Sequence, residues 1–450
     1  MVAPTVSTPE DHDESTERHS SASRPLTVAL FTDNYGPGHS GLLYAVHFLE
    51  GELLDRGAHV QVVAPACDGP NPYRDHPHRT ELRLPGVPVP GMSLVMATGR
   101  GFEQALRQLA ADPPDVIHVH GLGTVGLLGV WAADRLGVPL MVTWHTDFEA
   151  YADHYALLAP VADAYIRVLT VATHGMDRPQ LRDMSRFFQP RWWRRGRITR
   201  RAVLNAAREM LEAADLVTTP SDKTAARCLE LAPRAHIRVV PNGADALPAG
   251  PALPPAHGPR ILYVGRIAPE KSIGLLVDAF EWVREEIPHA ELMIVGNWRT
   301  GRWLEQKLRR ARRRRGVTLV GQVPREKLGP YYASADVFAF PSTTDTQALV
   351  LHEAAHAGLP IVSCDAELRL VIDEGVNGAF ARPTPESFAR QLVMMLQRLE
   401  DPEFRSRARE RSREMASWWT IQNQSDAIIE LYADLAAGRP IAERMRARAE

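Results

Sequence analysis

The chain has 450 residues, of which 45% are hydrophobic and 24% charged, a balance typical of a globular protein that excludes collagen, coiled coils and bulk disorder. Its 52 Lys and Arg residues against 54 Asp and Glu leave a formal net charge of −2, so no long-range field draws the whole chain to nucleic acid or anionic lipid. The three cysteines form no C-x-x-C pair, and we expect a reducing, cytoplasmic environment.

The first 25 residues carry Ser, Thr, Asp, Glu and Pro without an apolar core. Residues 1–25 are therefore predicted to form a disordered tail and not a signal peptide. The longest apolar stretch, residues 122–144, is interrupted by Asp134 and Pro139, which are costly in a bilayer or break a spanning helix. We expect a buried helix followed by a buried strand here, and no membrane span.

Two series of short apolar runs alternate with segments of helical period, and each run is apolar throughout, as in a parallel sheet covered on both faces. The first series is LTVALF (26–31), HVQVVA (59–64), DVIHVH (115–120) and LMVTWH (140–145). The second is ILYVG (261–265), ELMIVG (291–296), VTLVG (317–321), DVFAF (336–340) and PIVSC (360–364). The sequence predicts an α/β protein with two Rossmann-like parallel-sheet domains, whose ligands bind at the carboxyl ends of the strands.

A Pro-rich segment separates the two series. Residues 247–259 hold five prolines and two glycines, a composition that blocks both helix and strand, and we interpret them as the linker. The domains are then residues 26–246 and 260–416. A helix over residues 417–435, which contains Trp418 and Trp419, and a charged tail at 436–450 complete the chain.

The segment after the first strand reads Gly36-Pro37-Gly38-His39-Ser40-Gly41, formally G-x-G-x-x-G. A dinucleotide site requires the first Gly at the strand end and an acidic residue closing the next strand, and neither condition is met. Two interpretations of Gly41 stay open. Its backbone can approach a phosphate at a helix start, or the loop needs a positive φ.

Charged residues follow two strands of the second series. Arg266 and Lys271 come after ILYVG and suit a diphosphate, although an Arg and a Lys taken alone are more often solvated surface charges. Asp345 follows DVFAF, and Glu353 lies eight residues later in a helix expected to open at residues 347–349. Carboxylates in this arrangement can accept hydrogen bonds from the hydroxyls of a sugar and a ribose. The alternatives are a helix cap for Asp345 and an exposed helix face for Glu353, whose apolar neighbours favour a half-buried place.

Five segments in order resemble the retaining nucleotide-sugar glycosyltransferases of family four: VVPNGAD, VGRIAPEKSIGLLVDAF, IVGNW, LVGQVPREKL and PSTTDTQALVLHEAAHAGLPIV. The resemblance covers residues 26–435 and implies the GT-B fold, with two domains facing a cleft and a C-terminal helix crossing back to the first. The family's E-x7-E spacing is kept, with Asp345 in place of the first Glu. Two departures are Gln347-Ala348, where Phe-Gly is common, and the short segment 363–367 in place of a Gly-rich loop.

The resemblance implies a role for each residue of these motifs. Asp345 would contact the hydroxyls of the donor sugar and Glu353 the ribose, while Arg266 and Lys271 bind the diphosphate with backbone amides near Leu349. Val323 would meet the base through its backbone. The implied reaction is hexose transfer with retention, without metal or cofactor, because the D-x-D at residues 11–13 lies in the predicted tail. A nucleotide-sugar epimerase or hydrolase on the same fold, and a non-catalytic nucleotide-sugar binding module, stay open as alternatives.

The first half contributes His145, at the end of LMVTWH, in a segment that resembles the H-T-D-F of lipid-glycosylating family members. A neutral imidazole there can bond a sugar hydroxyl from the opposite wall of the cleft. The alternative for His145 is a core histidine bonded to a backbone carbonyl, which is our interpretation of His120.

Residues 186–201 mix four aromatics with seven arginines, which favours either peripheral membrane contact or an amphipathic helix on the first domain. The run at 307–315 is interpreted as a solvated helix face, with no nucleic acid as partner. A lipid or lipid-linked acceptor is expected, and a small polyol or natural product stays open.

Overall fold

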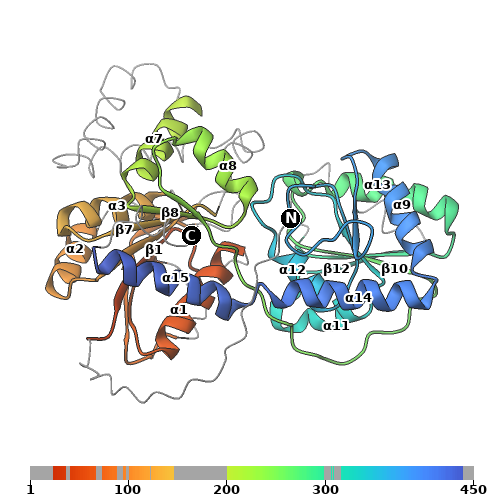
Figure 1. Ribbon diagram of the computed structural model, residues 1–450, viewed down its shortest axis with the longest axis horizontal. Coiled ribbons are helices and arrows are strands. Elements are labelled where there is room, and N and C mark those ends of the chain that lie inside the picture. Colours follow the sequence, from red (N-terminus) through yellow and green to blue (C-terminus); the bar gives the residue numbers. More distant parts are fainter. Residues whose placement is uncertain are drawn as a thin grey trace, which may run out of the picture.

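The computed structural model describes residues 24–36, 41–66, 73–88, 95–97, 101–121, 123–145, 200–297, 306, 308 and 316–438. Nearly all of the predicted tail, the H-T-D-F segment beyond His145, and most of both basic runs lie outside these residues. The described chain forms two lobes that lie side by side and are joined at a narrow waist (Figure 1).

The first lobe is built on a seven-stranded, fully parallel sheet of order β3-β2-β1-β6-β7-β8-β9. Four of its strands are the predicted runs: β1 (Thr27–Thr32), β2 (His59–Pro65), β6 (Val116–His120) and β7 (Leu140–Thr143). Three were not predicted: β3 (Arg79–Leu84), β8 (Leu216–Thr219) and β9 (Ile237–Val239). β3 and β9 are the edge strands, where partial exposure removes the continuous apolar signal.

Helices cover both faces of this sheet (Figure 1). They are α1 (Gly41–Asp55), α2 (Phe102–Ala111), α3 (Thr124–Leu136), α7 (Arg200–Ala213) and α8 (Asp222–Leu231). A short antiparallel hairpin of β4 (Gly86–Pro88) and β5 (Val95–Ala97) stands apart from the main sheet. The described part of residues 122–144 is α3 followed by β7, a buried helix and a buried strand as predicted.

The second lobe has a six-stranded parallel sheet of order β12-β11-β10-β13-β14-β15. Its strands are β10 (Arg260–Val264), β11 (Glu291–Val295), β12 (Val317–Gly321), β13 (Val337–Phe340), β14 (Ile361–Ser363) and β15 (Gly378–Phe380). The helices are α9 (Ile273–Glu286), α11 (Gly329–Ala333), α12 (Leu349–His356), α13 (Pro385–Arg398) and α14 (Pro402–Ser417), with short 3₁₀ helices η2 (Pro269–Lys271) and η3 (Arg325–Lys327). All five predicted runs are strands, so the two-sheet architecture is confirmed.

The lobes are connected twice. The Pro-rich segment has no helix or strand, and its Leu247 and Leu253 pack against the core of the second lobe. After α14 the chain returns to the first lobe as α15 (Ile421–Ala436), which lies against α1 and buries Ile428 and Tyr432 in the first-lobe core (Figure 1). This helix begins at Ile421 and not at residue 417, because the Thr420 hydroxyl caps it by accepting from the Asn423 N–H. Trp418 and Trp419 lie in the preceding turn.

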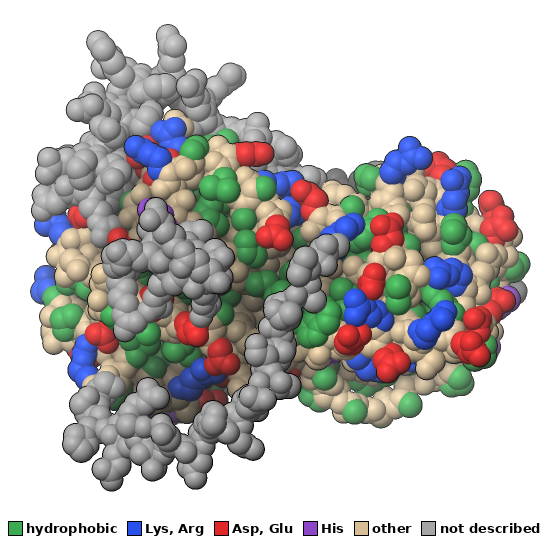
Figure 2. All heavy atoms as spheres, viewed as in Figure 1, with side chains coloured by type: hydrophobic (Ala, Val, Ile, Leu, Met, Phe, Trp, Pro, Cys, Tyr) green, Lys and Arg blue, Asp and Glu red, His purple; other side chains and the backbone are tan. Residues whose placement is uncertain are grey.

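Cationic and anionic side chains are interspersed over the visible face of the second lobe in Figure 2, in keeping with the nearly balanced composition. Within the described ranges, no helix combines the length and apolarity needed to cross a bilayer.

Candidate functional site

Asp345 lies in the loop that follows β13, and its carboxylate forms an ion pair with the ammonium of Lys271, the last residue of η2. The two meet because η2 follows β10 and β10 is the neighbour of β13 in the sheet. Burial alone would raise the pKa of Asp345, but the charge and hydrogen bond of Lys271, a hydrogen bond from Ser342 and the charge of Lys223 together outweigh it, and the pKa is lowered. Asp345 is therefore an anion at neutral pH. It does not cap α12, since Ala348 occupies the cap position.

Arg266 stands on the same edge of the sheet as Lys271. Its Nη2 lies 2.9 Å from Oε1 of Glu270, and its carbonyl accepts a hydrogen bond from the Tyr263 hydroxyl at 2.9 Å. Its side chain is 43% exposed, so the guanidinium can reach an incoming anion. The Thr344 hydroxyl donates to the Glu270 carbonyl at 3.1 Å and ties the Asp345 loop to the Arg266 loop. The structure thus brings Arg266, Lys271 and Asp345 to one edge of the second sheet.

α12 begins at Leu349, two residues later than the first predicted position. Ala348, at its N-cap, has φ 64° and ψ 84°, in the left-handed region that costs a residue with a Cβ. This is the position where the family commonly carries Gly. Leu349 faces the first lobe: its Cδ1 lies 3.8 Å from the place where a Cβ on Gly41 would stand. The helix start of α1 and that of α12 therefore meet between the lobes. Gly36, at the start of the same segment, has φ 98°, so the loop does contain a positive φ, as the second interpretation expected.

Glu353 is 5% exposed, more buried than predicted. Its Oε1 accepts from Nε of Arg325 at 2.8 Å and its Oε2 from the hydroxyl of Tyr332 at 2.8 Å. The Arg325 guanidinium in turn lies 4.9 Å from the ring centre of Phe48 on α1, so the first lobe contacts the partner of Glu353. Val323, two residues before Arg325, is half-buried against the second-lobe core.

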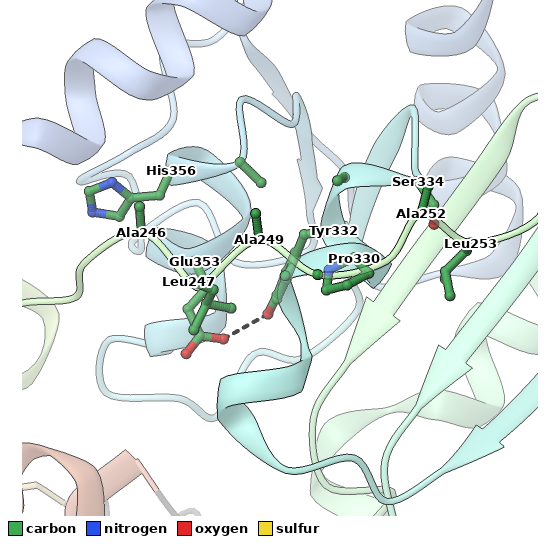
Figure 3. Close-up of a pocket in the computed structure, with 14 residues that line it drawn as sticks. Ala246, Leu247, Ala249, Ala252, Leu253, Pro330, Tyr332, Ser334, Glu353 and His356 are labelled. Carbon is green, nitrogen blue, oxygen red and sulfur yellow. Dashed lines mark hydrogen bonds between the residues drawn. The ribbon is translucent and has the colours of Figure 1, made fainter.

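Glu353 and Tyr332 also line a cavity of 410 Å³ that opens between the linker and helices α11 and α12 (Figure 3). The opposite wall is formed by Leu247, Ala249 and Leu253 of the linker. The carboxylate of Glu353 therefore lies where the linker meets the second lobe.

His145 follows β7 in the first lobe. Its Nε2 lies 3.1 Å from Nδ1 of His120, and burial lowers its pKa to about 4, which keeps the imidazole neutral at pH 7. The interpretation of His120 as a core histidine bonded to a backbone carbonyl needs correction: it is buried, but its ring partner is another imidazole. His118, two residues earlier on the same face of β6, is bonded to the hydroxyls of Tyr432 and Thr143 at 2.5 and 2.6 Å.

Of the G-x-G-x-x-G segment, only Gly36 and Gly41 lie among the described residues, and the residue that reaches a helix start here comes before the segment. Asp33, between β1 and this segment, accepts hydrogen bonds from the backbone N–H of Val125 at 2.8 Å and of Gly126 at 3.2 Å. It caps α3, so a carboxylate already occupies that helix start. Within the described ranges, no three His, Cys, Asp or Glu side chains are grouped so as to hold a metal ion.

Comparison with protein families gives two matches that follow one another along the chain. The model of Glycosyltransferase Family 4 matches residues 40–246, and that of Glycosyl transferases group 1 matches residues 258–398. The chain belongs to the family four glycosyltransferases. It is therefore an enzyme of the glycosyltransferase class, and the resemblance drawn from its motifs is confirmed.

Curated relatives of this glycosyltransferase cover most of its length. An alpha-monoglucosyldiacylglycerol synthase from Acholeplasma laidlawii is 26% identical over 398 residues, 83% of this chain and 89% of the relative. A protein of the same name from Streptococcus pneumoniae is 25% identical over 352 residues, 75% of this chain and 71% of the relative. A D-inositol 3-phosphate glycosyltransferase from Xylanimonas cellulosilytica is 27% identical over 445 residues, 91% of this chain and 95% of the relative.

Solved structures confirm the GT-B fold. The sucrose-phosphate synthase of Thermosynechococcus elongatus superimposes with a TM-score of 0.68 at 21% identity, over 92% of this chain and all of that one. HepE of Anabaena in complex with UDP gives a TM-score of 0.64 at 17% identity, over 91% of this chain and all of that one.

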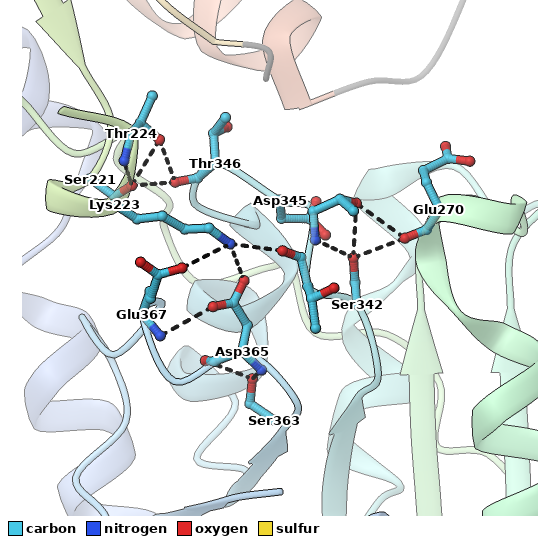
Figure 4. A network of polar contacts seen from close by, with 12 residues as sticks. Ser221, Lys223, Thr224, Glu270, Ser342, Asp345, Thr346, Ser363, Asp365 and Glu367 are labelled. Atoms are coloured by element: carbon cyan, nitrogen blue, oxygen red, sulfur yellow. Dashed lines mark hydrogen bonds and ion pairs between the residues drawn. The ribbon is translucent and has the colours of Figure 1, made fainter. Parts of the chain in front are cut away.

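Contacts between the two lobes of this glycosyltransferase were missed by the sequence analysis. Gln347, noted above only as a departure from the family, exchanges two hydrogen bonds with the backbone of Asn242 at 2.7 and 2.8 Å. Lys223, at the start of α8, reaches the loops that follow β13 and β14 (Figure 4). A lone Lys in a helix start gives no sequence signal, because its partner in the other lobe is 142 residues away.

Proposed function

We propose that this glycosyltransferase moves a hexose from a nucleotide-diphosphate sugar to a hydroxyl of a lipid acceptor, with retention of the anomeric configuration. The observation that carries the proposal is the pairing of Lys271 with Asp345 on an edge of the second sheet that also holds Arg266. A cation for the diphosphate and a carboxylate for the sugar then lie side by side, as a donor that joins these two groups requires.

The cations are proposed to stabilise the departing diphosphate. As the glycosidic bond breaks, negative charge grows on the β-phosphate, and Lys271 and Arg266 interact with it more strongly than with the intact donor. An ammonium has three donors, so Lys271 can keep Asp345 and still bind a phosphate oxygen. The N–H groups at the start of α12, beginning at Leu349, add the positive end of a helix dipole.

The nucleoside is proposed to bind at Glu353 and Val323. Both oxygens of Glu353 are already hydrogen-bonded to Arg325 and Tyr332, but each carboxylate oxygen has two lone pairs and can also accept a ribose hydroxyl. The base would lie against the backbone of Val323. The complex of the structural relative HepE with UDP supports a nucleoside diphosphate at this fold.

From the first lobe, the neutral ring of His145 is proposed to bond a hydroxyl of the donor sugar and to align the anomeric carbon with the acceptor. Gly41 leaves room for the donor phosphates beside Leu349. The acceptor hydroxyl would attack on the face from which the diphosphate leaves.

A lipid acceptor is supported by the names of two relatives, which are synthases of alpha-monoglucosyldiacylglycerol. Residues 186–201, with their arginines and aromatics, are the segment we propose to contact the membrane surface. Sedimentation with vesicles tests this contact: binding should rise when phosphatidylglycerol is added to phosphatidylcholine, and should fall when the seven arginines are replaced by Gln. If wild type and the Gln variant bind equally to vesicles with and without phosphatidylglycerol, the proposed membrane contact is refuted.

A donor panel tests the reaction. Purified protein is incubated with UDP-glucose, UDP-galactose or GDP-mannose, with and without diacylglycerol or extracted lipid, and products are identified by mass spectrometry. Consumption of donor only when acceptor is present supports the transferase. Donor loss without acceptor would favour an epimerase or hydrolase, and binding without any product would favour a binding module. Glu353→Gln should lower turnover with every donor that is used, and the anomeric configuration of the product decides between retention and inversion.

A further inference from the structure

The first turn of α8 in the first lobe holds the loop of the second lobe that carries Asp345. Ser221, the N-cap of α8, donates its hydroxyl to the carbonyl of Thr346 at 2.5 Å, and the hydroxyl of Thr224 donates to the same carbonyl at 3.2 Å. Lys223, between them, donates to the carbonyl of Thr343 at 2.9 Å. Both sides of Asp345 in the loop are thus fixed by one helix start of the opposite lobe (Figure 4).

Lys223 is the charged member of this set. Its side chain is 3% exposed, and its Nζ also pairs with the carboxylate of Asp365 and lies 3.8 Å from Glu367. All three oxygen groups that surround the ammonium come from the second lobe (Figure 4). Because all of these partners belong to the other lobe, the contacts of Lys223 exist only while the lobes are closed.

The loop also bonds to the first lobe on its other side. The hydroxyl of Thr346 donates to the carbonyl of His145 at 2.9 Å. Because Thr346 follows Asp345 in the loop, this bond links His145 to Asp345, the two residues proposed to bind the donor sugar. Lys223 lies close enough to Asp345 to help lower the pKa of that carboxyl. The carboxylate of Asp345 is therefore paired with Lys271 of its own lobe and feels the charge of Lys223 of the other.

We propose that Lys223 is a positioning residue of the transfer reaction: from the first lobe it fixes the Asp345 loop, so that the sugar site takes its reactive shape only when the lobes are closed. This inference rests on the proposed function. The competing explanation is that Lys223 merely neutralises the buried Asp365. Closing motions that complete a catalytic site are common, and displacement of a reacting group by about 1 Å can cost about 100-fold in rate.

Three variants separate these explanations: Lys223→Met, Asp365→Asn and the double variant. Lys223→Met removes the ammonium and keeps the length of the side chain, but leaves Asp365 buried without its cation. The double variant removes both charges, so it should recover stability to urea that Lys223→Met loses. If Lys223 positions the loop, kcat falls about 10- to 100-fold in Lys223→Met and stays low in the double variant, while the Kd for UDP changes less than kcat. A double variant with wild-type kcat would show that charge balance is the whole role, and would overturn the inference.

A matched control and a second measurement complete the test. Arg234→Met removes a cation of the same lobe, which pairs with Glu212 of that lobe, and should leave kcat unchanged. Small-angle scattering with UDP present reports lobe closure: Lys223→Met should have a larger radius of gyration than wild type, and equal radii would count against the inference. If wild type transfers nothing from any donor, the proposed function fails by itself, whereas an active wild type with unaffected Lys223 variants removes only this inference.

Discussion

Lys271 and Asp345 form an ion pair although 74 residues separate them in the chain. The second carboxylate oxygen of Asp345 is buried and has no hydrogen-bond partner among the described residues. A buried anionic oxygen without a donor is costly unless a ligand supplies one, and a sugar hydroxyl has the required chemistry. The pair thus leaves Asp345 charged, and under the proposed function its second oxygen is the one expected to accept a hydroxyl of the donor sugar.

Lys271→Met should lower kcat about 100- to 1,000-fold, because one cation facing the developing charge of the diphosphate is lost. The KM for the donor should rise less than kcat falls, since the interaction is strongest in the transition state. Steady-state kinetics on the donor identified by the panel measure both constants. Arg390→Met, which removes an exposed cation of the same lobe, is the control. A Lys271→Met enzyme with kcat within threefold of wild type would contradict the role given to this residue.

The two-sheet architecture, and the residues that the second lobe contributes to the candidate site, could be predicted from the sequence alone. Strands buried on both faces are apolar throughout, so the runs ending at Phe31, Gly265 and Phe340 were recognisable without knowledge of the sheet order. Residues placed just after such strands meet at one sheet edge, and for this reason Arg266, Lys271 and Asp345 could be expected together. Their pairing could not be foreseen, because it depends on β10 and β13 being neighbours.

Contacts between the lobes were beyond the sequence analysis for a physical reason. Lys223 and Arg325 belong to residue types that are usually exposed, and their partners lie in other elements. Only the relative placement of the lobes brings Lys223 to Asp365 or Arg325 to Phe48. The late start of α15 at Ile421 was likewise hidden, because the apolar pattern continues through the turn before it.

Arg325→Gln should raise the KM for the donor about 10-fold or more with a smaller change in kcat. Its guanidinium is the ionic partner of Glu353, and without it the carboxylate loses charge compensation and the fixed orientation that the proposed contact with the ribose requires. Lys327→Gln, two residues away and exposed, serves as the control. Phe48→Leu removes the ring beneath Arg325 and should weaken donor binding by about 0.5–1 kcal/mol. If the KM for the donor is unchanged in Arg325→Gln, Arg325 has no role in binding the nucleotide.

Ala348→Gly should stabilise the protein by about 1 kcal/mol. Ala348 is held at φ 64°, where a Cβ is unfavourable and Gly is not. The matched control is Ala433→Gly, at an exposed position within α15, which should lose about 1 kcal/mol through helix propensity. Urea unfolding at pH 7.5 compares the two. Destabilisation by both substitutions would mean that the left-handed conformation of Ala348 carries no strain that Gly relieves.

Because burial keeps His118, His120 and His145 uncharged, we expect the free energy of unfolding to fall in mild acid. Burial lowers the pKa of His145 to about 4 and that of His118 and His120 well below the ordinary value of 6.5. Between pH 6.5 and about 4 the unfolded chain therefore binds more protons than the folded one, and the free energy of unfolding decreases as the pH decreases.

Each such histidine contributes at most about 1.4 kcal/mol per pH unit to this slope. His120→Asn removes one of the three, so the loss of stability between pH 6.5 and 5 should be smaller than in wild type. His236→Asn, at an exposed position of the same lobe, should leave the slope unchanged. Urea unfolding at half-unit pH intervals measures the slopes. Because His120 also fixes the ring of His145 at 3.1 Å, the same variant should lower kcat at pH 7.5, where every ring is neutral. If His120→Asn reduces the pH dependence of the free energy of unfolding but keeps the wild-type kcat, then His120 affects stability and not the reaction.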